Sequence, residues 1–566
     1  MTEISGSRNP EIIGNSSAND SSLKLSHLRH AKKFWGPALI ALAATAGALL
    51  PLVAQGLRGI PWPFEDAAML FRYAETLART GDLAFNPGED PSQSDGATDL
   101  GFVIVIAVLI KAGFASITAA FLVNLVGLVL IGLAFGVANL RLWKLPTALV
   151  ALVAFGITLS VSAPLAGGFS SAIFGAILLL LFLLSLKMFR NIREAHTGNR
   201  LNFYILGALA GLCGFWRPEG FALSLIVMLL AFVAGLNFCF ARINRRRVWL
   251  AARRTTVGYL ATLASWVALR LIYFGQLLPT SAVNKVSPGS RLSLDTLGDP
   301  LYYYVITLSW LWLGTLLVSF WLARWSLALI PMVSVLIASI IWLPTELTFN
   351  WWGRIFWPLL PVLGALSLSL VSSALANKSH GSRRNDRFIG LVLIPIAVWM
   401  FYTVPDAFGR YSVADQASMY QLLRPIDSTG VRVASSEAGL VPLAVNEGYA
   451  LDTFVHNTRS IALEGSSALR GELEKFKPNL IYVNAYRSIG LSAGDCFRPE
   501  RTPFEVEWAE MTDLIYEYAK ENEFQVIYSL PRDDKGCVGI YALASPQLPT
   551  KVLQEISNST NGINPP

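Results

Sequence analysis

The hydrophobic positions of this chain fall into long runs separated by short polar segments, from residue 34 to residue 404. A helix needs about 20 apolar residues to cross the roughly 30 Å hydrocarbon core of a bilayer, and most of the runs have about that length. We therefore predict a mostly α-helical, polytopic membrane region over residues 34–404, with about eleven spans. They are expected near 34–57, 116–139, 146–163, 170–187, 203–216, 219–240, 255–273, 303–322, 325–343, 355–375 and 388–404.

Short blocks of Lys and Arg flank these runs and set the expected orientation. Basic residues accumulate on the cytoplasmic side of membrane proteins, which places the blocks at 141–144, 187–200, 242–254 and 378–387 there. The apolar stretch 100–113 then cannot be a span, and we expect a helix lying in the outer interface. With the N-terminus cytoplasmic, an odd number of spans places the chain after the last span outside, in a multi-pass protein of the cell membrane.

The two ends of the chain differ from the apolar region. Residues 1–33 are polar and rich in Ser and Asn, which predicts a disordered cytoplasmic tail. In residues 405–548 short β-rich runs alternate with helical patterns such as 508–521, which predicts an extracytoplasmic α/β domain, followed by a loose tail over 549–566. The expected strands are 431–434, 480–483, 524–528 and 538–541.

Composition agrees with a membrane protein and argues against nucleic acid as a partner. Of 566 residues, 53% are hydrophobic and 15% charged, whereas soluble domains carry about 25% charged residues. The net charge of +7 lies in blocks beside apolar runs, while a phosphate-binding surface would spread basic residues over a soluble face. Cys496 and Cys537 lie in the α/β part, where a disulfide between them would fit an oxidising compartment.

The first outer loop, residues 58–115, holds the densest candidate chemistry. Prolines precede Glu65 and Asp66, a pattern typical of a helix N-terminus, and the residues that follow alternate polar and apolar positions at helical spacing. We expect an amphipathic helix along the membrane surface. Asp66 and Tyr73 lie two turns apart on one face of it. The two acids would also complement the helix dipole without doing any chemistry.

From residue 65 the sequence reads EDAAMLFRYAETLARTGDLAFNPGEDPSQSDGATD. This resembles the first-loop pattern of bacterial GT-C glycosyltransferases, membrane enzymes that use polyprenyl-phosphate sugars, and in particular the terminal arabinofuranosyltransferase-like branch. Ala97 and Asp99 depart from the pattern, and Glu65 stands where Asp is usual. Segments around Arg217-Pro218-Glu219-Gly220 and Gly353-Arg354 are similar to the same family. The matching first-loop residues are Glu65, Asp66, Phe71, Arg72, Tyr73, Asn86, Pro87, Gly88, Glu89, Asp95, Gly96 and Thr98.

The resemblance implies transfer of a sugar, a pentose such as arabinofuranose among the candidates, from a polyprenyl-phosphate donor to a cell-envelope glycan or glycolipid. The phosphate leaves as a stable anion, whereas the acceptor hydroxyl needs a base to take its proton. Asp66 is our candidate base. Glu65 would orient the sugar, or the two carboxylates would hold Mg²⁺ or Mn²⁺ through their oxygens.

Four cations are expected at outer helix ends, where the donor phosphate would lie. Guanidinium groups bind phosphate bidentately, although each cation could instead extend to the membrane surface. Four other residues are expected to line the substrate, with membrane-belt or ion-pairing roles as alternatives for Trp352 and Glu219. The phosphate-binding candidates are Arg72, Arg217, Lys285 and Arg354, and the lining candidates are Tyr73, Trp352, Asp95 and Glu219.

Two other functions fit a polytopic protein with an outer domain. A transporter or flippase of lipid-linked sugars would often show paired halves, but the chain has no evident internal repeat and its polar residues concentrate in one loop. A non-catalytic envelope-assembly protein would need only the outer domain and its partner. A cavity shared by Asp66, Arg217 and Arg354 would favour the enzyme.

Overall fold

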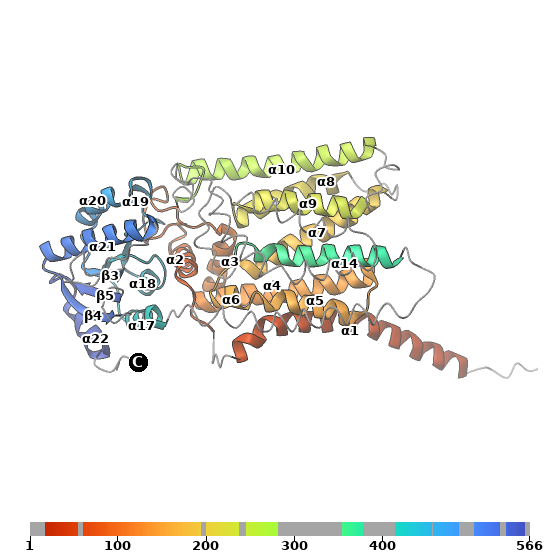
Figure 1. Ribbon diagram of the computed structural model, residues 1–566, viewed down its shortest axis with the longest axis horizontal. Coiled ribbons are helices and arrows are strands. Elements are labelled where there is room, and N and C mark those ends of the chain that lie inside the picture. The colour runs from red at the N-terminus through yellow and green to blue at the C-terminus, as the bar shows by residue number, and fades with distance from the viewer. Residues whose placement is uncertain are drawn as a thin grey trace, which may run out of the picture.

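A bundle of apolar helices running side by side forms one part of the molecule, and a mixed sheet with its helices forms the other (Figure 1). The computed structural model describes residues 17–54, 60–193, 200–236, 245–280, 354–376, 414–454, 457–485, 503–531 and 539–560. The bundle contains α1 (Ser17–Ala54), α4 (Ser116–Ala138), α5 (Thr147–Leu159), α6 (Ser162–Ala166), α7 (Ser171–Arg193), α8 (Leu201–Trp216), α9 (Gly220–Leu236), α10 (Arg245–Tyr273) and α14 (Leu360–Ala376), with short π and 3₁₀ turns at Asn139–Trp143 and Trp357–Leu359.

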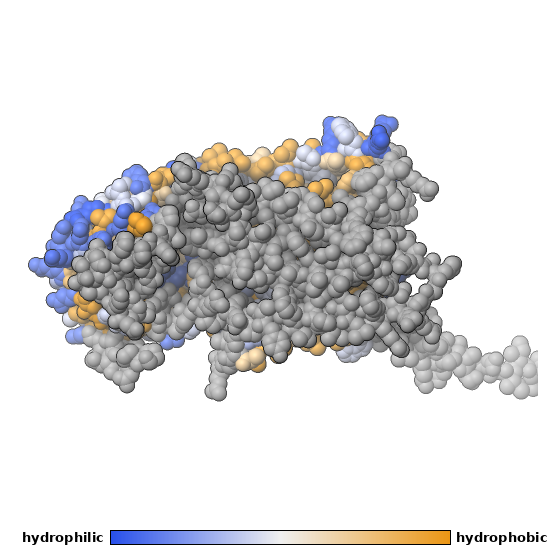
Figure 2. Space-filling model, viewed as in Figure 1, coloured by the Kyte–Doolittle hydropathy of each residue, from blue (hydrophilic) through white to orange (hydrophobic). Residues whose placement is uncertain are grey.

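Within the described residues, four helices are long and apolar enough to cross a membrane. They are Trp35–Ala54, Ser116–Trp143, Ser171–Ile192 and Arg245–Tyr273, and shorter apolar helices pack beside them. Large apolar side chains such as Leu260 and Ile272 are exposed on α10, and hydrophobic residues line that edge of the bundle (Figure 2). The protein is therefore a multi-pass membrane protein. The number of about eleven spans stays a prediction, since 303–322, 325–343 and 388–404 lie outside the described residues.

Glycines allow α8 and α10 to pack backbone against backbone. A Cβ atom at Gly207 would overlap the carbonyl of Thr255, and one at Gly258 would overlap the carbonyl of Tyr204. Small residues at such interfaces are the usual way in which membrane helices approach closely. This contact places the C-terminal end of α10 beside the first loop.

Part of each expected tail is helical in the structure. Residues 17–33 form the first turns of α1, because this polar stretch contains no proline or glycine to stop the helix. Residues 550–560 form α22 (Thr550–Thr560), which buries Val552 and Ile556. Those two side chains are one turn apart and form the apolar stripe of a packed helix.

The first loop forms two helices at one end of the bundle (Figure 1). α2 (Glu65–Thr80) begins after the prolines and ends at Gly81, whose φ of 88° is the left-handed conformation that glycine adopts readily. α3 (Leu100–Lys111) has 12 residues, about 18 Å at 1.5 Å per residue, too short to cross the hydrocarbon core. The prediction that residues 100–113 form a helix and not a span agrees with this length.

The α/β region follows the membrane part. Its sheet has the order β2-β1-β3-β5-β4, with parallel pairing among β2, β1 and β3 and antiparallel pairing among β3, β5 and β4. Four of its strands overlap the four predicted runs, and β2 was missed because its residues, Tyr-Ala-Leu-Asp, include no β-branched side chain. Cys496 and Cys537 lie outside the described residues. The strands are β1 (Arg432–Ser435), β2 (Tyr449–Asp452), β3 (Leu480–Ala485), β4 (Gln525–Pro531) and β5 (Gly539–Ala544), and the helices before α22 are α17 (Ala414–Leu423), α18 (Leu440–Ala444), α19 (Arg459–Glu464), α20 (Ser466–Phe476) and α21 (Pro503–Glu521).

The α/β region and the N-terminal end of α1 lie at opposite ends of the bundle (Figure 1). Hydrophilic residues dominate the visible surface of the α/β region (Figure 2). This arrangement fits a chain whose two ends face different sides of a membrane. Which side is cytoplasmic stays a prediction from the basic blocks.

Arg72 joins the first loop to the α/β region. The side chain is buried at the centre of α2, and its five N–H groups donate to acceptors of the protein. Four of the acceptors are backbone carbonyls, three of which belong to the α/β region. The acceptors are Phe85 O, Asn86 Oδ1, Pro442 O, Val445 O and Gly448 O.

Polar contacts on either side of Arg72 extend this junction. Asn86 pairs with both backbone groups of Ala450 in β2, at 2.9 Å to the carbonyl and 2.8 Å from the amide. The Glu75 carboxylate accepts two hydrogen bonds of 3.0 Å from Arg424. One hydrophobic cluster, which includes Phe71, Leu440 and Val445, continues from the loop into the α/β region. The first loop and the α/β region are thus packed as one body.

We predict that Arg72→Met destabilises the protein by on the order of 3 kcal/mol, because it leaves several buried carbonyls without a donor. The thermal unfolding midpoint of the detergent-purified protein measures this. Arg79→Met is the matched control, since Arg79 is exposed on the same helix and donates to the carbonyl of Asn446. Equal midpoints for the two variants would contradict the role given to Arg72.

Candidate functional site

Glu65 and Asp66 are neighbours at the start of α2 but face different parts of the molecule. Successive residues of an α-helix point about 100° apart. Glu65 faces α18 of the α/β region, whereas Asp66 faces the membrane bundle, where its carboxylate lies 2.6 Å from the Arg354 guanidinium. The two acids therefore have separate roles.

Glu65 links α2 to the α/β region through hydrogen bonds. Its Oε2 atom accepts hydrogen bonds from the amides of Gly439 and Leu440 at 2.9 and 2.8 Å, and its buried Oε1 atom has no hydrogen-bond partner. Burial, and then the negative charge of Glu437, hold the pKa of Glu65 well above its ordinary value, although the two amides lower it. Glu65 is thus a buried carboxyl that binds its proton more tightly than an exposed one, and its bonds to α18 favour a role in positioning α2 over contact with a sugar.

Asp66 and Arg354 form an ion pair where the first loop meets the bundle. The side chains are 24% and 10% exposed, so the pair is accessible on the Asp66 side. The Arg354 guanidinium stacks on the Phe169 ring, 4.1 Å from its centroid, and its backbone carbonyl accepts a hydrogen bond from Ser171. Arg354 is therefore fixed against the N-terminal end of α7, with its charge directed at Asp66.

Arg217 forms a second ionic cluster beside the same end of α7. It follows the last residue of α8, and its guanidinium lies 2.6 Å from Glu219 and 3.5 Å from Asp99. Asp99 also accepts a hydrogen bond from Ser170, and the Arg217 guanidinium lies 5.7 Å from the centroid of the Phe174 ring. Two carboxylates already neutralise Arg217.

The first residues of α7 connect the two arginines. Phe169 and Ser171 contact Arg354, while Ser170 and Phe174 contact the Arg217 cluster. Asp66, Arg354 and Arg217 therefore lie near one end of one helix, and a cavity shared by all three stays a prediction. A cavity of about 300 Å³ lies elsewhere, between residues 85–94 and the α/β region, and none of these three residues lines it.

The polar groups of three other candidate residues are bonded within the protein. Tyr73 is buried, and its hydroxyl bonds to Ser94, Gly96 and Asn457, which argues against a substrate-lining role. The N–H groups of Arg72 all donate to acceptors within the protein, which argues against a phosphate-binding role for this residue.

Asp95 is fully buried and forms a bidentate ion pair with the Arg270 guanidinium. The side-chain amide of Gln276 also donates a hydrogen bond to the Asp95 carboxylate. It therefore fixes the end of α10 to the first loop and does not face substrate. Arg270 was missed from the sequence, although a charge inside the apolar run 255–273 is the kind of residue that usually has a specific partner. Lys285 and Trp352 lie outside the described residues.

Divalent-cation binding by Glu65 and Asp66 is not favoured by their geometry. The Glu65 oxygens face α18 amides and a buried surface, while Asp66 faces a guanidinium. Among the residues that the structure describes, no group of three His, Cys, Asp or Glu side chains could hold a metal ion. The carboxylates present do not fit the expected Mg²⁺ or Mn²⁺, and we derive no step through a metal.

Two solved structures resemble this architecture over nearly the whole chain. Both are ArnT from Cupriavidus metallidurans. The apo form matches with a TM-score of 0.54, 12% sequence identity and coverage of 95% of this chain and 100% of that chain. The form bound to undecaprenyl phosphate matches with a TM-score of 0.51, 12% identity and coverage of 90% and 98%. The chain shares the fold of these two structures.

The likeness at 12% identity is one of fold alone. No protein-family model and no curated protein sequence matches the chain. The shared fold agrees with the expected polytopic architecture, while membership of the GT-C glycosyltransferases and of their arabinofuranosyltransferase-like branch stays a prediction from the first-loop residues.

We predict a pH signature for Glu65. A carboxyl with a raised folded-state pKa binds its proton more tightly in the folded protein, so its contribution to stability falls as pH rises from the unfolded value near 4.5 through the folded value. Glu65→Gln has no proton to lose and should show a smaller decline of the thermal midpoint over that range.

Glu447→Gln is the control, since Glu447 is exposed in the same α/β region and should leave the wild-type decline unchanged. Equal declines in wild type and Glu65→Gln would show that the pKa of Glu65 is not raised in the folded protein.

Proposed function

We propose that this protein is a membrane glycosyltransferase that moves a sugar from a polyprenyl-phosphate donor to a cell-envelope glycan or glycolipid on the extracytoplasmic face. The single observation that carries the proposal is the Asp66–Arg354 pair, a partly exposed carboxylate 2.6 Å from a guanidinium. The ArnT fold supports it, because one of the matching ArnT structures holds undecaprenyl phosphate. The first-loop resemblance favours a pentose such as arabinofuranose as the sugar.

The pair supplies the two functions that the reaction needs. Arg354 binds the donor phosphate, and Asp66 takes the proton of the acceptor hydroxyl. The acceptor oxygen bonds to the anomeric carbon as the bond from that carbon to the phosphate oxygen breaks, and the electron pair leaves with the phosphate. A phosphate on Arg354 competes with Asp66 for the guanidinium, so donor binding frees the carboxylate to act as a base.

Arg217 contributes less than Arg354 to binding of the donor phosphate. Its ion pairs with Glu219 and Asp99 leave little net charge to attract a phosphate. It holds the beginning of α3 and the end of α8 beside α7. Glu219 acts as its partner and does not need to contact the sugar.

Replacing Asp66 by Asn tests the base. We expect turnover with a panel of polyprenyl-phosphate-linked pentoses and hexoses in proteoliposomes to fall by about 100-fold or more, because a positioned base contributes about that much or more. Asp82→Asn is the control, an exposed acid just beyond α2, and should retain activity. An Asp66→Asn protein that is folded and transfers sugar at the wild-type rate would reject the assignment.

The two arginines should differ in their effect on donor binding. We expect Arg354→Gln to weaken binding of undecaprenyl phosphate by about tenfold or more, the loss typical of a hydrogen bond to a charged group, and Arg217→Gln to weaken it less. Isothermal titration in detergent measures both, with thermal midpoints as the check on folding. A larger loss for Arg217→Gln would contradict the phosphate role of Arg354.

A further inference from the structure

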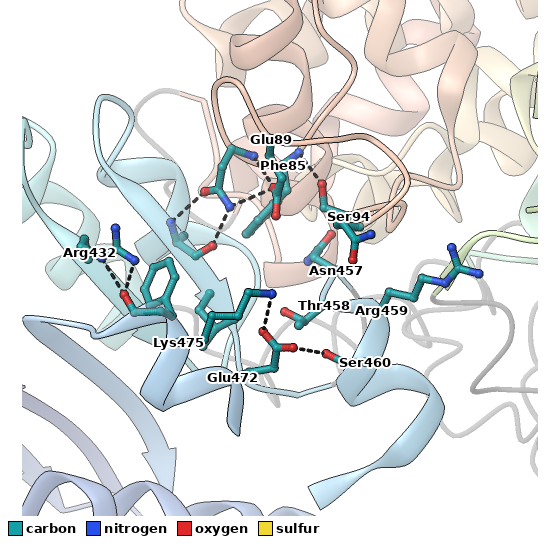
Figure 3. Close-up of a pocket in the computed structure, with 15 residues that line it drawn as sticks. Phe85, Glu89, Ser94, Arg432, Asn457, Thr458, Arg459, Ser460, Glu472 and Lys475 are labelled. Carbon is teal, nitrogen blue, oxygen red and sulfur yellow. Dashed lines mark hydrogen bonds and ion pairs between the residues drawn. The ribbon is translucent and has the colours of Figure 1, made fainter. Parts of the chain in front are cut away.

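A cavity of about 300 Å³ lies where the first loop meets the edge of the sheet. One wall comes from residues 85–94 of the loop, and the other comes from β1, β2, α19 and α20 (Figure 3). It shares no lining residue with the Asp66 site. The proposed reaction therefore makes no use of it.

The cavity is lined by hydrogen-bond donors and acceptors, which include both positively and negatively charged side chains. Glu472 accepts a hydrogen bond of 2.9 Å from Ser460 and lies 3.8 Å from the Lys475 ammonium group. Asn457 and Thr458 lie between this pair and the first-loop wall, as Figure 3 shows. Such a surface satisfies groups that both donate and accept.

The aromatic side chains Phe85 and Phe476 add apolar surface to the polar lining. A volume of this order is at the small end of ligand pockets, which are about 300–1,000 Å³. A lipid tail would need an apolar lining. The carboxylates Glu89 and Glu472 offset most of the positive charge of the three lining cations, which leaves little net charge to select a phosphate alone; these cations are Arg432, Arg459 and Lys475. Hydroxyl-rich rings with an apolar face suit this mixture best, and the cavity has room for a mono- or disaccharide unit.

The walls are held in place by bonds within the protein. The Glu89 carboxylate accepts from the backbone and side-chain nitrogens of Asn86 at 3.1 and 3.0 Å. Arg432 donates to the Phe476 carbonyl, and Asn457 donates to Asp452. A cavity whose polar groups are already fixed loses less conformational entropy when it binds a ligand.

We infer that this cavity binds a saccharide unit of the acceptor glycan, and so presents the acceptor from the α/β side of the first loop. The inference rests on the proposed glycosyltransferase function. Lys475, whose side chain is 79% exposed, lies at its opening, and Glu472, at 22%, lies deeper. These two side chains can be changed without disturbing the Arg72 junction.

The test is direct binding of saccharides in the absence of donor. The purified full chain in detergent is titrated with oligosaccharides of arabinofuranose, galactofuranose, mannose and N-acetylglucosamine, and binding is followed by saturation-transfer-difference NMR. We expect at least one oligosaccharide to bind wild type, and the double variant Glu472→Ala/Lys475→Ala to bind it about tenfold more weakly.

Arg470→Ala/Glu474→Ala is the matched control, because that ion pair of 3.0 Å also lies on α20 but does not line the cavity. It should bind as wild type does, and Asp66→Asn should also bind normally, which separates saccharide binding from sugar transfer. If no oligosaccharide binds wild type, or if the Glu472/Lys475 variant binds as tightly as the control, the inference is overturned while the role of Asp66 stands on its own test.

Discussion

The buried Arg72 side chain is the contact on which the rest of the structure depends. A guanidinium out of water is costly unless each of its donors finds an acceptor, and Arg72 finds them in the first loop and in the turn that follows α18. The Arg72 donors therefore all find acceptors only when the α/β region packs against α2. Glu65 and Asn86 then complete the junction along α18 and β2.

This junction sets the direction in which Asp66 points. With Glu65 turned into the α/β region, the helical rotation leaves Asp66 facing the bundle, where Arg354 meets it at the N-terminal end of α7. The same packing encloses the saccharide-sized cavity between residues 85–94 and the sheet edge. Donor chemistry on the bundle side and acceptor recognition on the α/β side would thus be joined through one docked loop.

The sequence predicted the membrane class, the first-loop helix and four of the strands, because hydrophobic periodicity and β-rich runs are local signals. It also associated Asp66, Arg217 and Arg354 through a motif resemblance. It could not separate the role of Arg72 from that of Arg354, since both are arginines beside apolar helices. Their difference depends on long-range partners: carbonyls 370 or more residues away for Arg72, and a carboxylate 288 residues away for Arg354. The helices at residues 17–33 and 550–560 were not predicted, because they depend on continuation from a span or on packing, which local polarity does not show.

The most direct test of the account is an experimental structure of the protein in lipid nanodiscs with undecaprenyl phosphate bound. The account predicts the phosphate within hydrogen-bond distance of the Arg354 guanidinium, at the N-terminal end of α7, with the Asp66 carboxylate beside it and separated from the arginine. A phosphate bound at the far end of the bundle, or one with Asp66 and Arg354 still paired and out of reach of it, would contradict the central claim.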